Sequence, residues 1–417
     1  MVKLINPPQL NSLDDKLDPP LGLLYIAGEL RSQGIPVEII DLPFIERSGW
    51  KDAIGSVDTI GITVYSSSLY LAKEIRDIAK RNNPQCKVVV GGPHPTTLWR
   101  DMVREFDVVV RGEGEYALQR IDGNMVVAPF IEDLDRLAFP ARDMVDLRHY
   151  TRKVAGKKAT SITTSRGCPY ACAFCCKDVH GHRVRYFSIG RIVNEITSIR
   201  AAYGIDSFIF YDDTFALDRK HYYPLCDELA KLNITFRCNG DARQNTLEDF
   251  KTLYRAGCRE ISFGIESGSQ KILNIINKGV TVEQNRNAIK NAKAAGLIVK
   301  AFLIIGSPGE TRETVEETKR FMAEADPDQY TLFTFVPLPG CAAWDNPDKY
   351  HFRIVNRDFK DFFNIAGQNE GGLVVETDEL SCRDIADLRK ELIEHLQGRG
   401  QRGQLQDYYK RVEVPCG

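Results

Sequence analysis

Short apolar segments of strand length alternate with longer segments of helical periodicity in two series along this 417-residue chain. The first series covers residues 1 to about 120, and the second begins near Thr160. Such alternation is typical of parallel sheets, because parallel neighbours are joined by a crossover that is usually a helix. The sequence therefore predicts an α/β protein, and its length is enough for two or three domains.

The first series predicts a doubly wound, Rossmann-like sheet. Its expected helices are Leu21–Gln33 and Leu69–Arg81, and its expected strands are Val2–Ile5, Val37–Asp41, Thr59–Val64, Lys87–Val90 and Asp107–Arg111. Ligands of such sheets bind beyond the carboxyl ends of the strands. Turns rich in glycine or serine stand at these ends, at residues 66–68, 91–93 and 112–114. We therefore expect a binding site along this edge.

The second series predicts a partial (β/α)6 barrel of the TIM type, since a full barrel has eight strands. The expected strands are Ser161–Thr164, Ser207–Tyr211, Thr235–Cys238, Glu260–Ile265, Ile298–Ile305 and Gln329–Val336. Expected helices include Arg191–Ala202, Leu247–Ala256, Val282–Ala295 and Thr311–Ala325. We place the first domain at residues 1–125, a linker at 126–159, the barrel at 160–340 and a small C-terminal extension at 341–417. The extension contains one expected helix, Arg383–Gln397.

A tight cysteine triplet follows the first strand of the second series. Cys168, Cys172 and Cys175 have the spacing C-x3-C-x2-C. Iron–sulfur clusters are usually held by four thiolates, so three predict a [4Fe–4S] cluster with one iron open to a small molecule. Zinc is the alternative, but structural zinc usually takes four ligands, often as separate C-x2-C pairs, and no second pair is present. The open iron indicates an enzyme.

The composition limits the partners and the compartment. The chain has eleven cysteines, an odd number without the spacing of a disulfide framework, which favours a reducing, cytoplasmic location. The net charge of −2 does not favour nucleic acid as a general partner. No run of 18 apolar residues predicts a transmembrane helix. The N-terminal segment is expected to be a strand, not a signal peptide.

The second series resembles the radical S-adenosylmethionine (SAM) superfamily over about Thr160 to Gly340. In that superfamily three cysteines hold the cluster, and the amino and carboxylate groups of SAM fill the open iron site. The resemblance implies SAM contacts from Phe174, Tyr211, Asn239, Arg243, Glu266, Ser267 and Gly306.

These implied SAM contacts have plainer alternatives. Phe174 stands where the family packs adenine, but it could be ordinary loop packing. Glu266 could be an ion-pair carboxylate, and Ser267 a helix N-cap. The turn at Gly306 resembles the family's adenine-side turn, and its alternative is a simple tight turn. The order Asn-Gly-Asp-Ala-Arg at residues 239–243 also differs from the commoner Asn-Gly-Arg-Ala-Asp.

The first series resembles the cobalamin-binding domain of the cobalamin-dependent radical SAM enzymes. The similar segments are residues 19–27, 66–68, 91–95 and 111–115. The resemblance implies cobalamin contacts from Leu21, Gly22, Tyr65, Ser66, Ser67, Ser68, Gly91, Gly92, His94, Gly112, Glu113 and Glu115. The motif Asp-x-His-x-x-Gly of other corrinoid enzymes is missing after Asp41, so no histidine ligand is expected from that loop. His94 is interpreted as a contact to the corrin side chains or as a turn histidine.

The resemblance implies methyl transfer to an unactivated carbon, through a 5′-deoxyadenosyl radical and methylcobalamin. The cofactors would be a [4Fe–4S] cluster, SAM and cobalamin. Segments 177–185 and 211–215 are similar to a branch that contains the ring-forming cyclase of bacteriochlorophyll synthesis and the hopanoid methylases. The alternative function is therefore a cyclase or rearrangement enzyme that transfers no methyl group. A carrier protein without turnover, or a tRNA methylthiotransferase, is a further alternative.

The catalytic residue is not determined, and Asp212, Asp213 and Cys176 are candidates. The two aspartates could instead cap the helix that follows them, and Cys176 could merely pack. The expected substrate is a small molecule, a lipid or a peptide. The expected partner is an electron donor such as flavodoxin or ferredoxin, with no nucleic acid and no transmembrane segment.

Overall fold

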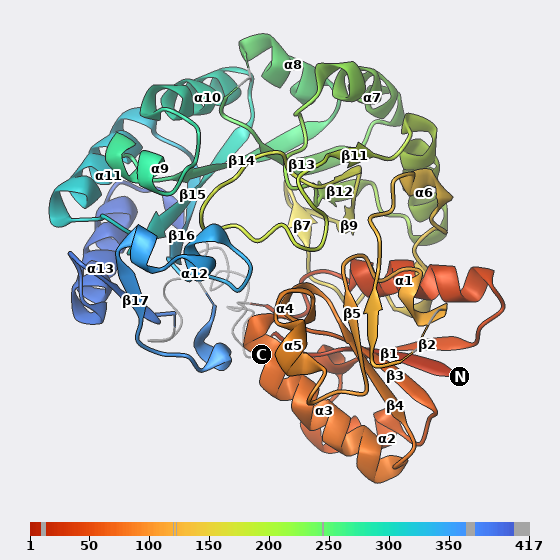
Figure 1. The fold of residues 1–417 in the computed structure, drawn as a ribbon. Coiled ribbons are helices and arrows are strands. Elements are labelled where there is room, and N and C mark those ends of the chain that lie inside the picture. Colours follow the sequence, from red (N-terminus) through yellow and green to blue (C-terminus); the bar gives the residue numbers. More distant parts are fainter. Residues whose placement is uncertain (10–13, 120, 122, 244–245, 364–371, 404–417) are drawn as a thin grey trace, which may run out of the picture. The chain divides into compact units, whose positions relative to one another are not determined.

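The structure, a computed structural model, describes residues 1–9, 14–119, 121, 123–243, 246–363 and 372–403. Within these residues the chain divides into two compact units (Figure 1). The first unit contains Met1–Arg152, Lys158–Pro169 and Cys176–Ile205. The second contains Lys153–Lys157, Tyr170–Cys175 and the described residues from Asp206 onward. The cysteine triplet is thus divided, since Cys168 belongs to the first unit while Cys172 and Cys175 belong to the second.

The first unit contains the predicted doubly wound sheet. Among its described residues the strand order is β2-β1-β3-β4-β5-β6, and all neighbours are parallel. The strands are β1 (Val2–Asn6), β2 (Val37–Asp41), β3 (Thr59–Thr63), β4 (Lys87–Gly91), β5 (Val108–Arg111) and β6 (Met125–Val127). The helices are α1 (Leu21–Ser32), α2 (Trp50–Ile54), α3 (Leu69–Asn82), α4 (Pro93–Thr97) and α5 (Trp99–Met102). Helix α1 lies on one face of the sheet and α2 and α3 on the other (Figure 1).

The burial of strand β4 shows that this sheet is covered on both faces. Val88, Val89 and Val90 of β4 are all buried, although successive side chains of a strand point to opposite faces. A strand covered on both faces reads as a continuous apolar run, as parallel sheets require. The first unit also contains β9 (Thr160–Ile162), the hairpin of β10 (Ser165–Arg166) with β11 (Arg185–Tyr186), and α6 (Ile189–Tyr203).

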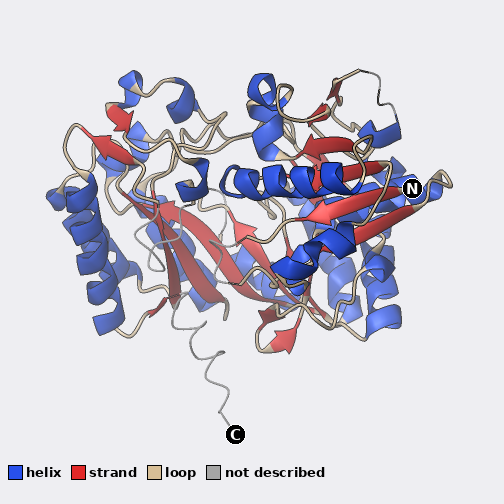
Figure 2. Ribbon diagram, turned by 90° about the horizontal axis from the view of Figure 1, so that it is seen from below, coloured by secondary structure: helices blue, strands red, loops and turns tan. Residues whose placement is uncertain are grey.

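The second unit contains the parallel series of the predicted barrel, with helices along its outer face (Figures 1 and 2). Its parallel strands pair in the order β12-β13-β14-β15-β16-β19. They are β12 (Ser207–Phe210), β13 (Thr235–Gly240), β14 (Cys258–Glu266), β15 (Ile298–Ile305), β16 (Gln329–Thr334) and β19 (Arg402–Gly403). The helices are α7 (Arg219–Leu232), α8 (Leu247–Arg255), α9 (Gln270–Ile275), α10 (Val282–Ala294), α11 (Arg312–Ala325), α12 (Ala342–Asp345) and α13 (Cys382–Gly398). The remaining strands are β7 (Lys153–Val154), β8 (Lys157–Lys158), of which Lys158 belongs to the first unit, and the antiparallel pair β17 (Phe352–Ile354) and β18 (Val375–Thr377).

Local sequence signals fix where several helices of this unit begin. Thr246, Thr281, Thr311 and Ser381 are N-caps of α8, α10, α11 and α13, and each takes part in a reciprocal capping box with the residue three positions later. Such a box satisfies backbone N–H groups that have no partner within the helix. The predicted strands and helices are therefore confirmed within a few residues. The elements that were not predicted include helices α2, α4, α5 and α12 and the short strands β6, β7, β8, β10, β11, β17, β18 and β19.

Within the described residues, no helix has both the length and the apolar character needed to cross a membrane.

Candidate cofactor sites

The turns that follow β3, β4 and β5 are joined by hydrogen bonds at one edge of the first sheet. Ser66 Oγ lies 2.9 Å from His94 Nδ1, and the His94 backbone N–H donates to the Val64 carbonyl. The Gly112 N–H donates to Thr96 Oγ1 at 3.1 Å. The structure thus brings together the serine turn, the Gly91–Gly92 turn and the start of the Gly112 turn. These are segments that the resemblance assigns to cobalamin.

Glycine is required at two of these turns. Gly92 has φ +102°, and a Cβ there would lie 3.2 Å from the Val64 carbonyl oxygen. Gly112 has φ +92°, and its Cβ would lie 2.7 Å from the Ala128 carbonyl oxygen. Positive φ and close backbone approach are conditions that glycine meets best. Leu21 and Gly22 begin α1, and Gly22 is exposed, with open space at the position of a Cβ. The Tyr65 ring is also exposed.

His94 is a buried, neutral histidine. Burial, together with the positive charge of Lys73, lowers its pKa to about 4. The imidazole is therefore uncharged near neutral pH. It is hydrogen-bonded in the turn beside the prolines, and a contact with the corrin side chains stays a prediction.

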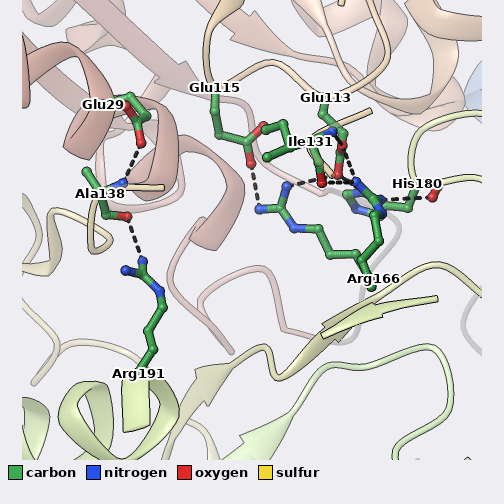
Figure 3. A network of polar contacts seen from close by, with 9 residues as sticks. Glu29, Glu113, Glu115, Ile131, Ala138, Arg166, His180 and Arg191 are labelled. Atoms are coloured by element: carbon green, nitrogen blue, oxygen red, sulfur yellow. Dashed lines mark hydrogen bonds and ion pairs between the residues drawn. The ribbon is translucent and has the colours of Figure 1, made fainter. Parts of the chain in front are cut away.

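Glu113 and Glu115 lie at the same edge and are paired with arginines, and their contact with cobalamin stays a prediction. Both carboxylates are buried and form ion pairs with arginines of the β10–β11 hairpin (Figure 3). Burial raises the pKa of Glu113, but hydrogen bonds from His180 and Arg185 and the charge of Arg166 outweigh it, so the pKa falls to about 2. Glu113 is thus ionised at neutral pH, with its charge matched by neighbouring cations.

The cysteine triplet lies on a loop whose backbone forms hydrogen bonds within each of the two units. In the first unit, the N–H of the buried Cys168 donates to the Gly181 carbonyl at 3.3 Å. In the second, the Cys175 N–H donates to the Cys172 carbonyl at 3.1 Å, and the Ala173 N–H donates to Ile276 at 2.8 Å. None of the described cysteines forms a disulfide; Cys416 lies outside the described residues.

Three thiols on one short loop fit an iron–sulfur cluster, because soft thiolates are the ligands that such clusters take. Across the part of the chain that the structure describes, however, no three His, Cys, Asp or Glu side chains converge in the manner of a metal site. The assignment of Cys168, Cys172 and Cys175 as the three ligands therefore stays a prediction.

An ion pair between the buried Glu266 and the partly buried Lys278 lies beside Cys172 in the second unit. Lys278 Nζ lies 2.6 Å from Glu266 Oε1 and 5.8 Å from the centre of the Phe174 ring. Burial lowers the pKa of Lys278, but the charges of Glu266 and Cys172 outweigh it, so the net pKa is raised and the ammonium is charged. Glu266 ends β14 with a left-handed φ of +62°. The ion-pair interpretation of Glu266 is thus confirmed.

Phe174 is partly buried in the second unit. It packs against two clusters of buried residues, one that contains Phe335 and one that contains Ile272 and Leu273. Its loop-packing interpretation is therefore confirmed, while the adenine contact stays a prediction.

Arg243 is held by protein groups on several sides. Its Nε lies 2.8 Å from Asp241 Oδ1, and its Nη1 donates to the Lys278 carbonyl at 2.9 Å. The guanidinium also stacks 3.1 Å from the centre of the Tyr170 ring, and the Tyr170 hydroxyl donates to Asp241. In the order Asp-Ala-Arg, Asp241 and Arg243 therefore form a local ion pair, and both side chains contact Tyr170, which lies between Cys168 and Cys172 in the sequence. A direct SAM contact from Arg243 stays a prediction.

The turns after β14 and β15 are also held by hydrogen bonds between their own residues. Ser267 Oγ accepts from the Ser269 N–H at 3.1 Å, but Ser269 is the N-cap of α9, so the N-cap interpretation of Ser267 is wrong. Glu310 accepts from the N–H groups of Gly306 and Ser307 at 2.5 and 3.2 Å. Burial raises the pKa of Glu310 to about 8, although these hydrogen bonds lower it.

The catalytic candidates belong to different units, Cys176 to the first and Asp212 and Asp213 to the second. Asp212 is buried and its carbonyl accepts from the Asn239 amide at 3.2 Å, whereas Asp213 is exposed. Helix α7 is capped by Asp218, so the interpretation of the aspartate pair as its cap is wrong. Cys176 Sγ lies 3.8 Å from Thr97 Oγ1 at the end of α4. Tyr211 follows β12 and is exposed.

Sequence reasoning missed Tyr170, Lys278, Arg166 and Arg185. Arg166 and Tyr170 stand within or next to the triplet, which was a signal for them, whereas Lys278 is distant in sequence and had none.

Comparison with known proteins assigns both series. The model of the radical SAM superfamily matches residues 162–322, and that of the B12 binding domain matches residues 17–122. An uncharacterized methyltransferase, PH0819 of Pyrococcus horikoshii, is 34% identical over 363 residues, covering 78% of each chain. The anaerobic magnesium-protoporphyrin IX monomethyl ester cyclase of Rubrivivax gelatinosus is 28% identical over 361 residues; 77% of this chain and 65% of the cyclase are covered.

Among solved structures, the fold is similar to that of the radical SAM methyltransferase TsrM from Kitasatospora setae, with tryptophan substrate and a SAM analogue bound. The TM-score is 0.69 at 20% identity, over 95% of this chain and 88% of TsrM. This likeness confirms the predicted fold. Together with the family matches, it shows that the chain is an enzyme of the cobalamin-dependent radical SAM family, whose cofactors are a [4Fe–4S] cluster, SAM and cobalamin.

Proposed function

We propose that this enzyme transfers a methyl group to an unactivated carbon of an organic substrate. The observation that carries the proposal is the 34% identity to a methyltransferase over 78% of both chains, together with the B12-binding series. An unactivated carbon has no acidic proton, so a radical is the reasonable route to it. When bound, the cluster, SAM and cobalamin supply the radical and the methyl group, and the protein supplies binding and orientation.

The residues of the chain support this role in defined ways. Cys168, Cys172 and Cys175 would hold the cluster and leave one iron for SAM. Lys278, which is paired with Glu266, places a positive charge beside Cys172. The turns at Ser66–Ser68 and Gly91–Gly92 would cradle cobalamin, because glycine lets the backbone approach a ligand closely.

A cyclase or rearrangement activity is the second candidate. The 28% identity to the magnesium-protoporphyrin cyclase favours it, although this chain spans only 65% of that protein. The two candidates share cofactors and differ in product mass. We further propose a small-molecule, lipid or peptide substrate, an electron donor such as flavodoxin or ferredoxin, and a cytoplasmic location. The reducing compartment would protect the cluster from oxygen.

The test is anaerobic reconstitution with iron, sulfide, cobalamin, a chemical reductant that supplies the electron for SAM cleavage, and SAM labelled in its methyl group, followed by mass analysis of candidate acceptors. Methyl transfer predicts a product that has gained one labelled methyl group. A cyclase predicts a product without the label. Cys172→Ala is the control, and it should form no 5′-deoxyadenosine. Normal formation of 5′-deoxyadenosine by this variant would contradict the ligand assignment.

A further inference from the structure

A network of charged side chains connects the residues that follow β5 to the β10–β11 hairpin, whose first strand ends two residues before Cys168. Arg166 Nη1 lies 3.0 Å from Glu113 Oε1, and Arg166 Nη2 lies 2.6 Å from Glu115 Oε1 (Figure 3). Arg185, which pairs with Arg166 in the β10–β11 hairpin, contacts Glu113 Oε2 at 2.6 Å. His180 Nδ1 lies 3.1 Å from Glu113 Oε1.

The two carboxylates and the two arginines of the network are closed to solvent, whereas the His180 side chain is 41% exposed, and the network also contacts backbone groups. The side chain of Glu113 is 0% exposed, and those of Arg166 and Arg185 are 6% and 4% exposed. Glu113 Oε2 also accepts from the Ile131 N–H at 2.6 Å, and Arg185 donates to the carbonyls of Ile131 and His180. Fixed, fully paired charges of this kind specify one backbone arrangement, because a partner that moves leaves a buried charge unpaired.

The segment between the network and the cysteine has little freedom of its own. Arg166 is followed by Gly167, whose φ is +91°, and a Cβ on Gly167 would lie well under 3.0 Å from the Arg183 carbonyl oxygen. The next residue, Cys168, donates its N–H to the Gly181 carbonyl. The position of Arg166 therefore sets the position of Cys168 through one tightly packed residue.

We propose that Glu113 and Glu115 are positioning residues of the cluster loop, which hold Cys168 in place through Arg166 and Arg185. For these two carboxylates the role replaces the cobalamin contact that the resemblance implies. The proposal rests on Cys168 being a cluster ligand. It does not depend on methyl transfer, so it stands equally for a cyclase.

The first test compares thiol alkylation rates in the full-length chain without cluster, resolved by peptide mass analysis. Cys86 is the internal reference, because it is a buried thiol of the same unit. Glu113→Gln should speed alkylation of Cys168 relative to Cys86 by at least about tenfold, which corresponds to about 1.4 kcal/mol. Glu132→Gln is the matched control, since Glu132 forms an exposed ion pair with Arg183 nearby. It should leave the ratio unchanged.

The second test uses the reconstituted holoenzyme. Glu113→Gln should release iron to a chelator faster and change the electron paramagnetic resonance spectrum of the reduced cluster, whereas Glu113→Asp, which keeps the charge, should restore part of both properties. Equal acceleration of Cys168 and Cys86, with an unchanged cluster spectrum, would overturn the proposal and leave a purely structural ion pair. If Glu113→Gln does not fold, the alkylation rate of Cys168 relative to Cys86 is measured in Glu115→Gln, which removes the ion pair with Arg166. A raised ratio supports the proposal, and an unchanged ratio overturns it. Product mass does not enter either test, so failure here is distinct from failure of the proposed function.

Discussion

Replacing Gly167 by alanine tests the packing next to Cys168 most directly. Gly167 has φ +91°, a region that residues with a Cβ rarely adopt. The added Cβ would also meet the backbone of Arg183 and, at 3.2 Å, the Gly181 carbonyl oxygen. Backbone atoms of a paired hairpin cannot rotate away as the end of a long side chain can. We therefore expect two separate penalties at this position.

The size of each penalty follows from the structure. A left-handed conformation costs a residue with a Cβ about 1–2 kcal/mol. Overpacking adds about 1–3 kcal/mol, so Gly167→Ala should lower the free energy of unfolding of the first unit by about 2–5 kcal/mol. Gly204 is the matched control in the same unit, because it has φ +66° but open space at the Cβ position. Gly204→Ala should show only the first penalty, about 1–2 kcal/mol.

Urea unfolding of the full-length chain without cluster measures both variants, with a probe in each unit because the two units need not unfold together. Iron bound after reconstitution is the second measurement, and Gly167→Ala should bind less than Gly204→Ala. Equal destabilisation by the two substitutions would refute the reasoning, since it would mean that the Arg183 backbone moves aside without cost.

Further predictions concern the second unit. Arg243→Met should destabilise the second unit by about 3–5 kcal/mol, because the buried Asp241 loses its cation, whereas Tyr170→Phe should cost about 1.5 kcal/mol for one hydrogen bond to a charged group; equal effects in urea unfolding would contradict this. Lys278→Met should lower the free energy of unfolding of the second unit more than the double variant Lys278→Met/Glu266→Gln does, because only the single variant leaves a buried carboxylate unpaired. A double-mutant cycle measures the difference. The pKa of Glu310 is raised from its ordinary 4.5 to about 8, so the native state retains a proton that the unfolded chain loses, and stability should fall as the pH rises between these values. Glu310→Gln should remove that slope, and an unchanged slope would show that Glu310 is ionised in the native protein.

Most of the helices and strands of the fold could be predicted from local sequence patterns. Strand β15 was predicted with its observed bounds, because a nearly continuous apolar run between Gly296 and Gly306 is a property of the segment itself. Thr311 and Ser381 mark helix starts for the same reason, since a capping box is formed by residues three positions apart. Strand β6 was missed, because its Met125–Val127 is short and depends on pairing with β5.

The roles of the polar residues depended on contacts between distant parts of the chain. The sequence by itself determined that Cys168, Cys172 and Cys175 share one short loop and that glycine turns end the strands of the first sheet. Only the tertiary structure paired Glu113 with Arg166 and Arg185, which are 53 and 72 residues away in sequence. A buried carboxylate at a strand end and a ligand-binding carboxylate look the same in a sequence. The difference arises only when folding removes water and leaves each charge with the partner that the packing provides.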